Sequence, residues 1–293
     1  MTTTTTMPSM TRSSEEQITA GVDVGSSAVK IAVLHTASSG ETKVLALLTE
    51  RIRRRELRKV VNDGYQGALC AAGLTAEEVC YVASTGEGEL VEFRRGHFYG
   101  MTTHARGAIF LIPETRAVLD VGALHARAMR IDERSRVLGY RMTSQCASGS
   151  GQFLENVARY LGISLEDVGP LSTKAANPQV VSSICAVLAE TDVINMVSRG
   201  ISPPDILKGI HLSMAGRYLK LLRAIDVRGK VAITGGLSAD TGLAQALQEK
   251  AREDGLDMEI RTHPNAIYAG ALGAALWGAY RHRKLADHVE VSA

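Results

Sequence analysis

Alternating apolar and polar positions near the start of the chain predict three consecutive β-strands, Ile18–Asp23, Val29–His35 and Val44–Leu48. A Gly/Ser-rich turn, Val24–Ala28, joins the first two. The next stretch alternates between helical and strand-like spacing, which predicts a helix, a strand and a helix over Glu56–Ala72, Val79–Ala83 and Thr102–Leu111. The pattern is typical of an α/β protein that begins with a meander of strands.

The opening pattern recurs in the middle of the chain. A strand over Arg116–Val121 carries the same Asp-Val-Gly, and strand-like runs at Ala126–Asp132 and Val137–Met142 follow it. The remainder predicts helices at Gln152–Leu161, Ile184–Ser198, Asp205–Ala224, Thr241–Arg252 and Ala266–Arg281, with strands at Lys230–Thr234 and Met258–Arg261. Two copies of one strand–turn–strand–strand unit indicate a duplicated α/β fold, and no low-complexity linker separates the halves within 17–285.

Composition is that of an ordinary globular protein, because 45% of the 293 residues are apolar and 22% are charged. A formal net charge of +2 gives no reason to expect a nucleic acid or a membrane surface as a partner. No apolar run approaches the roughly 20 residues that a membrane span needs. Residues 1–16 read as a disordered polar extension, and the four scattered cysteines favour a reducing cytoplasm over a disulfide scaffold.

The first Asp-Val-Gly turn has the chemistry of a phosphate site. Gly25, Ser26 and Ser27 expose backbone N–H groups and hydroxyls, and Asp23 can hold Mg²⁺ through water. A hairpin turn without a ligand is the alternative for one such turn. The second copy, with Asp120 and Gly122, favours two turns that hold a polyphosphate from both sides. A third Gly-rich strand end, Gly235-Gly236, could pass close to an adenosine.

These turns, together with Ala269-Gly-Ala-Leu-Gly273, resemble the ordered motifs of the actin/Hsp70/hexokinase ATPase superfamily. The resemblance implies a duplicated α/β ATPase fold with two domains around a nucleotide cleft. We expect one domain at 17–114 plus 266–285, and a second at 115–265.

Two cysteines lie near predicted helix starts in Gly/Ser-rich surroundings, Cys146 before Gly149-Ser150-Gly151 and Cys185 after Ser182-Ser183. Helix N-termini stabilise thiolates and anionic clusters. Two small buried hydrophobic residues are the alternative. A cubane iron–sulfur cluster needs four thiolates, so two from one chain imply a second chain at the cluster. We place Cys70 and Cys80 in the core.

The segments around Cys146 and Cys185 resemble the ATP-dependent electron activators, a family that comprises activators of 2-hydroxyacyl-CoA dehydratases and activating subunits of benzoyl-CoA reductase. The amino-acid sequences of segments 96–107 and 189–201 are most similar to those of the benzoyl-CoA reductase subunits. The resemblance implies that Cys146 and Cys185 ligate a [4Fe-4S] cluster shared with a paralogous subunit. It also implies ATP or ADP with Mg²⁺, reduced ferredoxin as electron donor, and catalytic reductase subunits as acceptor. Gly149, Ser150 and Gly151 would relay between the nucleotide and the cluster.

The second turn departs from the homodimeric activators, which carry Asp-Ile-Gly-Gly-Gln-Asp where this chain has Asp120-Val-Gly-Ala-Leu124-His125. The Gln and the second Asp of that motif are candidates for orienting water and Mg²⁺, and Leu124 and His125 replace them in this chain. This difference favours a subunit of an unequal heterodimer. Three alternatives stay open: a homodimeric dehydratase activator, a small-molecule kinase of the same fold, and a subunit that binds nucleotide without hydrolysing it.

Overall fold

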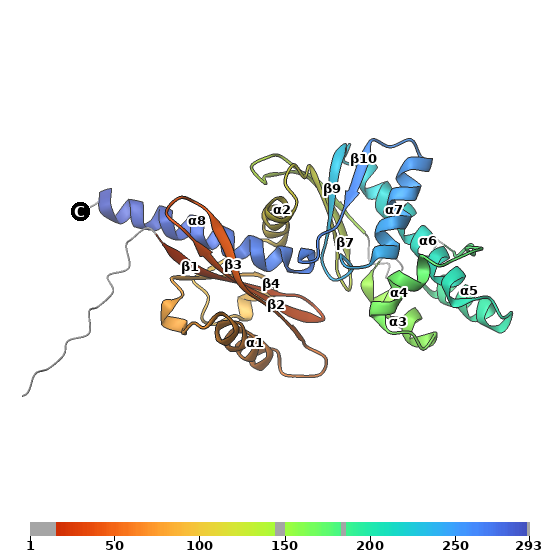
Figure 1. Cartoon of the computed structure of the whole chain (residues 1–293), viewed down its shortest axis with the longest axis horizontal. Helices are drawn as coiled ribbons and strands as arrows, with labels where there is room; N and C mark the ends of the chain where they lie inside the picture. The colour runs from red at the N-terminus through yellow and green to blue at the C-terminus, as the bar shows by residue number, and fades with distance from the viewer. Residues whose placement is uncertain (1–15, 144–149, 183–185, 292–293) are drawn as a thin grey trace, which may run out of the picture.

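The computed structural model describes residues 16–143, 150–182 and 186–291 (Figure 1). The first of two five-stranded sheets has the order β3-β2-β1-β4-β5. β1 pairs antiparallel with β2 and parallel with β4. The strands of this sheet are β1 (Gln17–Val24), β2 (Ala28–Thr36), β3 (Thr42–Arg51), β4 (Tyr81–Gly86) and β5 (Gly96–His97).

The second sheet repeats this arrangement, with the order β10-β9-β6-β7-β8. Its central strand pairs antiparallel with the strand that follows it and parallel with a strand from later in the chain, as in the first sheet. The strands are β6 (Ala117–Val121), β7 (Ala126–Ile131), β8 (Val137–Met142), β9 (Gly229–Thr234) and β10 (Met258–Arg261). The duplicated α/β architecture that the repeated Asp-Val-Gly pattern predicts is therefore present.

The helices form layers around the two sheets (Figure 1). Helix α1 (Leu57–Ala72) covers one face of the first sheet, and the long α8 (Ala269–Val291) covers the other. Helix α2 (Gly100–Leu111) packs against both α8 and the second sheet. The far face of the second sheet carries the largest apolar core, under α3 (Gly151–Tyr160), α4 (Leu165–Ser172), α5 (Ala186–Ser198), α6 (Pro203–Arg223) and α7 (Thr241–Glu253).

Small residues let α8 lie directly on β1. A Cβ atom on Gly21 would stand 1.9 Å from the carbonyl oxygen of Ala271, so only glycine permits this contact. The small residues of Ala269-Gly-Ala-Leu-Gly273 thus bring the start of α8 against β1 and α2. Helix α8 is joined to the second half through α2, which packs against both.

Helix α4 is absent from the elements that the sequence predicts. Gly169 and Pro170 inside it are typical of loops. Ser164 caps the N-terminus of this helix by accepting a hydrogen bond from the Asp167 N–H.

Three further expectations from the sequence were wrong in position. Cys70, which we placed in the core, is exposed, since it lies one position past the buried Leu69 and so faces away. Cys80, also placed in the core, is half-buried. Strand β4 begins and ends two or three residues later than Val79–Ala83.

The polar extension at 1–16 falls outside the described residues except for Glu16. In the part of the chain that the structure describes, every helix is too short or too polar to span a membrane.

Candidate nucleotide-binding site

The two Asp-Val-Gly turns have the same geometry. In the first, the Gly25 N–H donates to the Ala28 carbonyl at 3.1 Å; in the second, the Gly122 N–H donates to the His125 carbonyl at 2.9 Å. Each turn joins the central strand of its sheet to the following antiparallel strand. The repeat therefore places two equivalent loops at the same end of two equivalent sheets.

Each turn is preceded by a buried carboxylate with a basic residue opposite it. Asp23 pairs in register with Lys30 across β1 and β2, and Asp120 pairs with Arg127 across β6 and β7. Both carboxylates are more than nine-tenths buried. The sequence repeat predicted the two aspartates but not the cations. A signal for the cations was present, since Arg127 follows Asp120 at the same interval at which Lys30 follows Asp23.

The two cations act differently. The Lys30 ammonium extends along the first turn, where a Cβ on Gly25 would lie 3.2 Å from its Nζ atom. Arg127 instead binds its carboxylate: Nε and Nη2 donate to Oδ2 of Asp120 at 3.1 and 2.5 Å. Lys30 therefore stays available to an anion at the first turn, whereas Arg127 holds Asp120.

Asp120 is an ionised buried group. Burial by itself would raise the pKa of its carboxyl, but electrostatic interactions with His104 and Arg127, the Arg127 hydrogen bond and the more distant Lys30 outweigh burial and lower it. A carboxylate that stays charged while buried can orient water or a cation only through the oxygen that Arg127 leaves open. That oxygen, Oδ1, lies 3.5 Å from Nδ1 of His104.

A glycine at the end of a neighbouring strand packs closely against the end of each central strand, β1 and β6. Gly86 is the last residue of β4, with φ +68°, and Gly235 follows β9 with φ +84°. A Cβ on Gly86 would lie 2.3 Å from the Val24 carbonyl, and one on Gly235 would lie 2.5 Å from Oδ1 of Asp120. Both positions need a left-handed backbone and close approach, which glycine alone supplies at low cost. The chain thus passes tightly over both aspartates, while the neighbouring Gly236 is exposed.

Helix α3 is bonded to the second turn. The Gly151 N–H donates to the Gly122 carbonyl and the Gln152 N–H to the Ala123 carbonyl, both at 2.9 Å. Ser150, which precedes the helix, is buried. Of the three residues expected to relay between the sites, Gly151 is bonded to the second turn, and Gly149 lies outside the described residues.

The residues at these turns fit a polyphosphate with a divalent cation. Exposed Ser26 and Ser27 and the amides of both turns are phosphate donors, and Lys30 adds a positive charge. The carboxylate oxygens of Asp23 are the ligand type that Mg²⁺ prefers. In contrast, Leu124 and His125 lie exposed at the second turn and bring no carboxylate to it.

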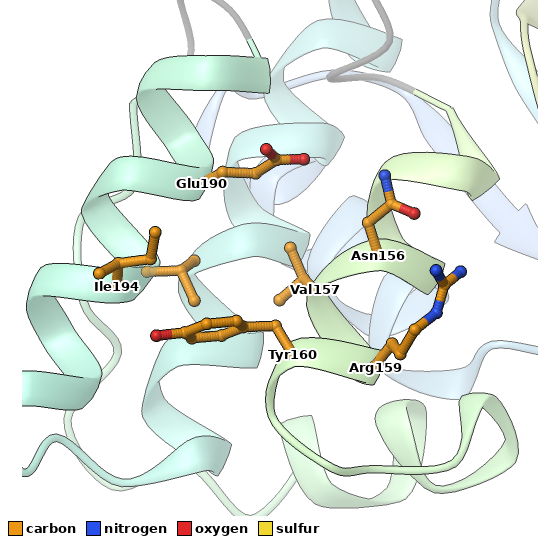
Figure 2. A pocket seen from close by; sticks show the side chains of 7 residues that line it. Asn156, Val157, Arg159, Tyr160, Glu190 and Ile194 are labelled. Atoms are coloured by element: carbon orange, nitrogen blue, oxygen red, sulfur yellow. The ribbon is translucent and has the colours of Figure 1, made fainter.

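A cavity of about 350 Å³ lies elsewhere, between α3 and α5. Figure 2 shows Tyr160 and Ile194 directed into the space between these two helices. Its lining residues are Asn156, Val157, Arg159, Tyr160, Glu190, Val193 and Ile194. Helices α3 and α5 are the ones that follow Cys146 and Cys185 in sequence, and both cysteines lie outside the described residues.

Residues 20–278 match the model of the BadF/BadG/BcrA/BcrD ATPase family. One of the subunits of benzoyl-CoA reductase from Thauera aromatica is 61% identical over 270 residues, which cover 92% of this chain and 95% of the relative.

Two solved structures have closely similar folds. One is component A of the (R)-2-hydroxyglutaryl-CoA dehydratase from Acidaminococcus fermentans, with a TM-score of 0.84 at 29% identity over 91% of this chain and 99% of that one. The other is the activator of the 2-hydroxyisocaproyl-CoA dehydratase from Clostridium difficile with bound ADPNP, with a TM-score of 0.83 at 30% identity over 93% and 98%. These likenesses confirm the actin-like ATPase fold class.

Proposed function

Because the chain belongs to the BadF/BadG/BcrA/BcrD ATPase family, we propose that it is an ATP-dependent electron-activating subunit of a benzoyl-CoA reductase. The observation that carries the proposal is the 61% identity with a benzoyl-CoA reductase subunit over almost the full length of both chains. The paired turns supply the physical support, since they present amides, a lysine and a carboxylate as a nucleotide site requires.

In this proposal, ATP or ADP with Mg²⁺ lies between two domains, 17–114 plus 266–285 and 115–265. Asp23 holds the cation through water, and Gly25, Ser26 and Ser27 bind phosphate with Lys30. Gly122 and Asp120 approach from the second half, and Gly235 and Gly236 pass the adenosine. The nucleotide supplies the free energy that a low-potential electron transfer needs, by favouring one of two domain arrangements.

The second site of the proposal is a [4Fe-4S] cluster that a paralogous subunit completes. Cys146 and Cys185 would be this chain's two ligands, and the cluster would accept an electron from reduced ferredoxin and pass it to the catalytic reductase subunits. The bonds from Gly151 and Gln152 to the second turn support coupling, because movement of that turn would move the start of α3. We place the complex in the cytoplasm, where thiolates stay reduced.

Electron paramagnetic resonance of the dithionite-reduced complex tests the cluster. The chain is purified anaerobically with its paralogous subunit, with and without Mg-ATP, as wild type, Cys146→Ser and Cys70→Ser. We expect the cluster signal to be lost in Cys146→Ser and kept in Cys70→Ser, whose thiol is exposed on α1. An unchanged signal in Cys146→Ser would refute the ligand assignment.

Nucleotide titration tests the first site. Lys30→Ala should weaken binding of Mg-ADPNP at least about tenfold, because it removes a charge-assisted contact to phosphate. Lys43→Ala is the matched control, since Lys43 is an exposed lysine of β3. Equal affinity in both variants would contradict the placement of phosphate at the first turn.

The fold likeness to two dehydratase activators favours a second candidate, a homodimeric activator of a 2-hydroxyacyl-CoA dehydratase. The first candidate, a subunit of a heterodimer, is favoured by the exposed Leu124 and His125 and by the bond of Arg127 to Asp120. Expression of the chain alone separates the two: an iron-containing, ATP-hydrolysing homodimer would support the second candidate, whereas cluster formation only with the paralogous subunit would support the first.

A further inference from the structure

Helix α2 connects the two halves of the molecule. Its contact with α8 is backbone to backbone, because a Cβ on Gly107 would lie 2.0 Å from the Ala269 carbonyl and one on Gly273 would lie 1.8 Å from the Thr103 carbonyl. Its opposite face packs into an apolar cluster of the second sheet that includes Val118 and Met129. The helix is therefore fixed to the first half and touches the second.

One polar side chain interrupts this apolar contact. His104 of α2 is buried, and its Nδ1 atom lies 2.9 Å from Oγ1 of Thr234, a buried hydroxyl at the end of β9. Thr234 is the register partner of Asp120 and directly precedes Gly235. The imidazole of His104 thus contacts the second half at Thr234, which lies beside both Asp120 and Gly235.

The other ring nitrogen faces the first half. A Cβ on Gly270, at the start of α8, would lie 2.9 Å from Nε2 of His104 and 2.6 Å from Oδ2 of Asp23. The imidazole of His104 and the carboxylate of Asp23 therefore both lie next to Gly270. One side chain lies between the two equivalent aspartates.

We propose that His104 is a positioning residue that couples the two phosphate turns, through the hydrogen bond of its Nδ1 atom with Thr234. The inference rests on the proposed nucleotide function and adds a residue to it. Relative movement of the two halves must strain or break this bond, since His104 moves with α8 and Thr234 moves with β9. Through this bond, binding of phosphate at the first turn changes the positions of Asp120 and Gly235.

Paired variants separate coupling from simple burial. Asparagine places a polar amide atom where Nδ1 lies, so His104→Asn keeps a hydrogen-bond partner for Thr234; glutamine replaces only Nε2, so His104→Gln loses that partner. Thr234→Val removes the hydroxyl at constant shape, and Thr234→Ser restores it. We expect the two variants that lose the bond to behave alike, and the two that keep it to behave like the wild type.

Hydrogen exchange of the full complex with Mg-ADPNP is the decisive measurement. In the wild type we expect slower exchange in the peptides that contain Gly25 and Gly122. In Thr234→Val and His104→Gln the Gly25 peptide should stay slowed, and the Gly122 peptide should not. In the same two variants we expect about a tenfold lower kcat for ATP hydrolysis with KM changed less than about twofold.

The two failures are distinguishable. If neither peptide is slowed in the wild type, the proposed nucleotide function is wrong, and this inference with it. If both peptides are slowed in Thr234→Val as in the wild type, the nucleotide function stands and the coupling role of His104 is refuted. A lowered melting temperature with unchanged kcat in both variants would also refute it, because that is the result of a purely structural contact.

Discussion

Arg127 and Asp120 form a two-point contact, in which Nε and Nη2 of the guanidinium both donate to Oδ2 of the carboxylate. The equivalent pair of the first sheet, Lys30 and Asp23, faces across the strands in the same register, but the lysine extends along the turn. The repeated unit is thus chemically unequal in its two copies. In the first copy, Asp23 and Lys30 are available to a ligand. In the second copy, Arg127 is hydrogen-bonded to Asp120.

Replacing Arg127 by methionine should lower the free energy of unfolding at pH 7 by about 2 kcal/mol, because it leaves a buried carboxylate without its donors. The arginine helps to keep the pKa of Asp120 low, so its removal raises that pKa. Protonation then becomes easier, and the penalty should shrink as the pH is lowered towards 4. Urea unfolding at several pH values measures this.

Arg130→Met is the control for that experiment, since Arg130 is an exposed residue of the same strand. It should change the free energy of unfolding by less than about 0.5 kcal/mol. A pH-independent loss in Arg127→Met would show that lost packing, rather than the charge of Asp120, dominates.

Gly235→Ala should destabilise the protein more than Gly255→Ala. Both glycines have a left-handed backbone, with φ of +84° and +63°, so both substitutions carry a backbone cost of about 1 kcal/mol. A Cβ at Gly235 would additionally clash with Asp120 and the Val121 carbonyl, whereas no atom lies within 4 Å at Gly255. The clash should add about 1–3 kcal/mol.

Thermal or urea unfolding of the two alanine variants checks the difference directly. Equal losses would mean that the end of β9 relaxes at no cost and that the close approach to Asp120 is not fixed.

Much of the fold could be predicted because its signal is local. Strands β6 and β8 and helix α7 begin or end within a residue of the expected positions, and the repeated Asp-Val-Gly marks both central strands. The contacts that complete the site are not local. His104 and Thr234 lie on different elements, and only the packing of α2 between α8 and the second sheet brings them together.

Helix α4 shows a different limit. Its Gly169 and Pro170 are loop-forming residues by propensity, and the glycine is needed because a Cβ there would lie 2.9 Å from Oδ1 of Asp240. Tertiary contact with the start of α7 therefore decides the structure of this segment. Cys70 was misplaced for the opposite reason, since a one-position error on a helix turns a side chain by about 100°.

Asp240 should make the protein sensitive to acid. Its Oδ2 lies 3.2 Å from Nε2 of the buried His211, whose Nδ1 lies 2.8 Å from the Ser172 hydroxyl, and its Oδ1 accepts from the Leu243 N–H. Burial would raise the pKa of Asp240, but the hydrogen bond and the electrostatic interaction with His211 and the backbone donors outweigh burial and lower that pKa.

A depressed carboxyl pKa contributes stability that is present above its unfolded value of about 3.9 and is lost as the pH falls through the folded value. Asp240→Asn should therefore lower the free energy of unfolding by about 2 kcal/mol at pH 7, with a difference from the wild type that declines below about pH 4. Asp226→Asn, at an exposed carboxylate, is the control. A difference that persists unchanged to pH 3 would contradict the assignment.

The proposed assembly with a paralogous subunit should need the exposed apolar face of α5. Ile194 is 49% exposed and lines the cavity between α3 and α5, and Val197 lies one turn further on the same side. An aspartate at Ile194 would place a charge in a desolvated contact, so Ile194→Asp should weaken association by at least about tenfold. Light scattering of the co-expressed pair at several concentrations measures the association.

Leu285→Asp provides the matched control, because Leu285 is a similarly exposed leucine (53%) near the other end of the molecule on α8. It should leave the pair intact, and both variants should keep the unfolding midpoint of the isolated chain within a few degrees. Dissociation of the pair by Leu285→Asp but not by Ile194→Asp would place the interface on α8, away from the helices that follow Cys146 and Cys185, and would contradict the proposed cluster between the two subunits.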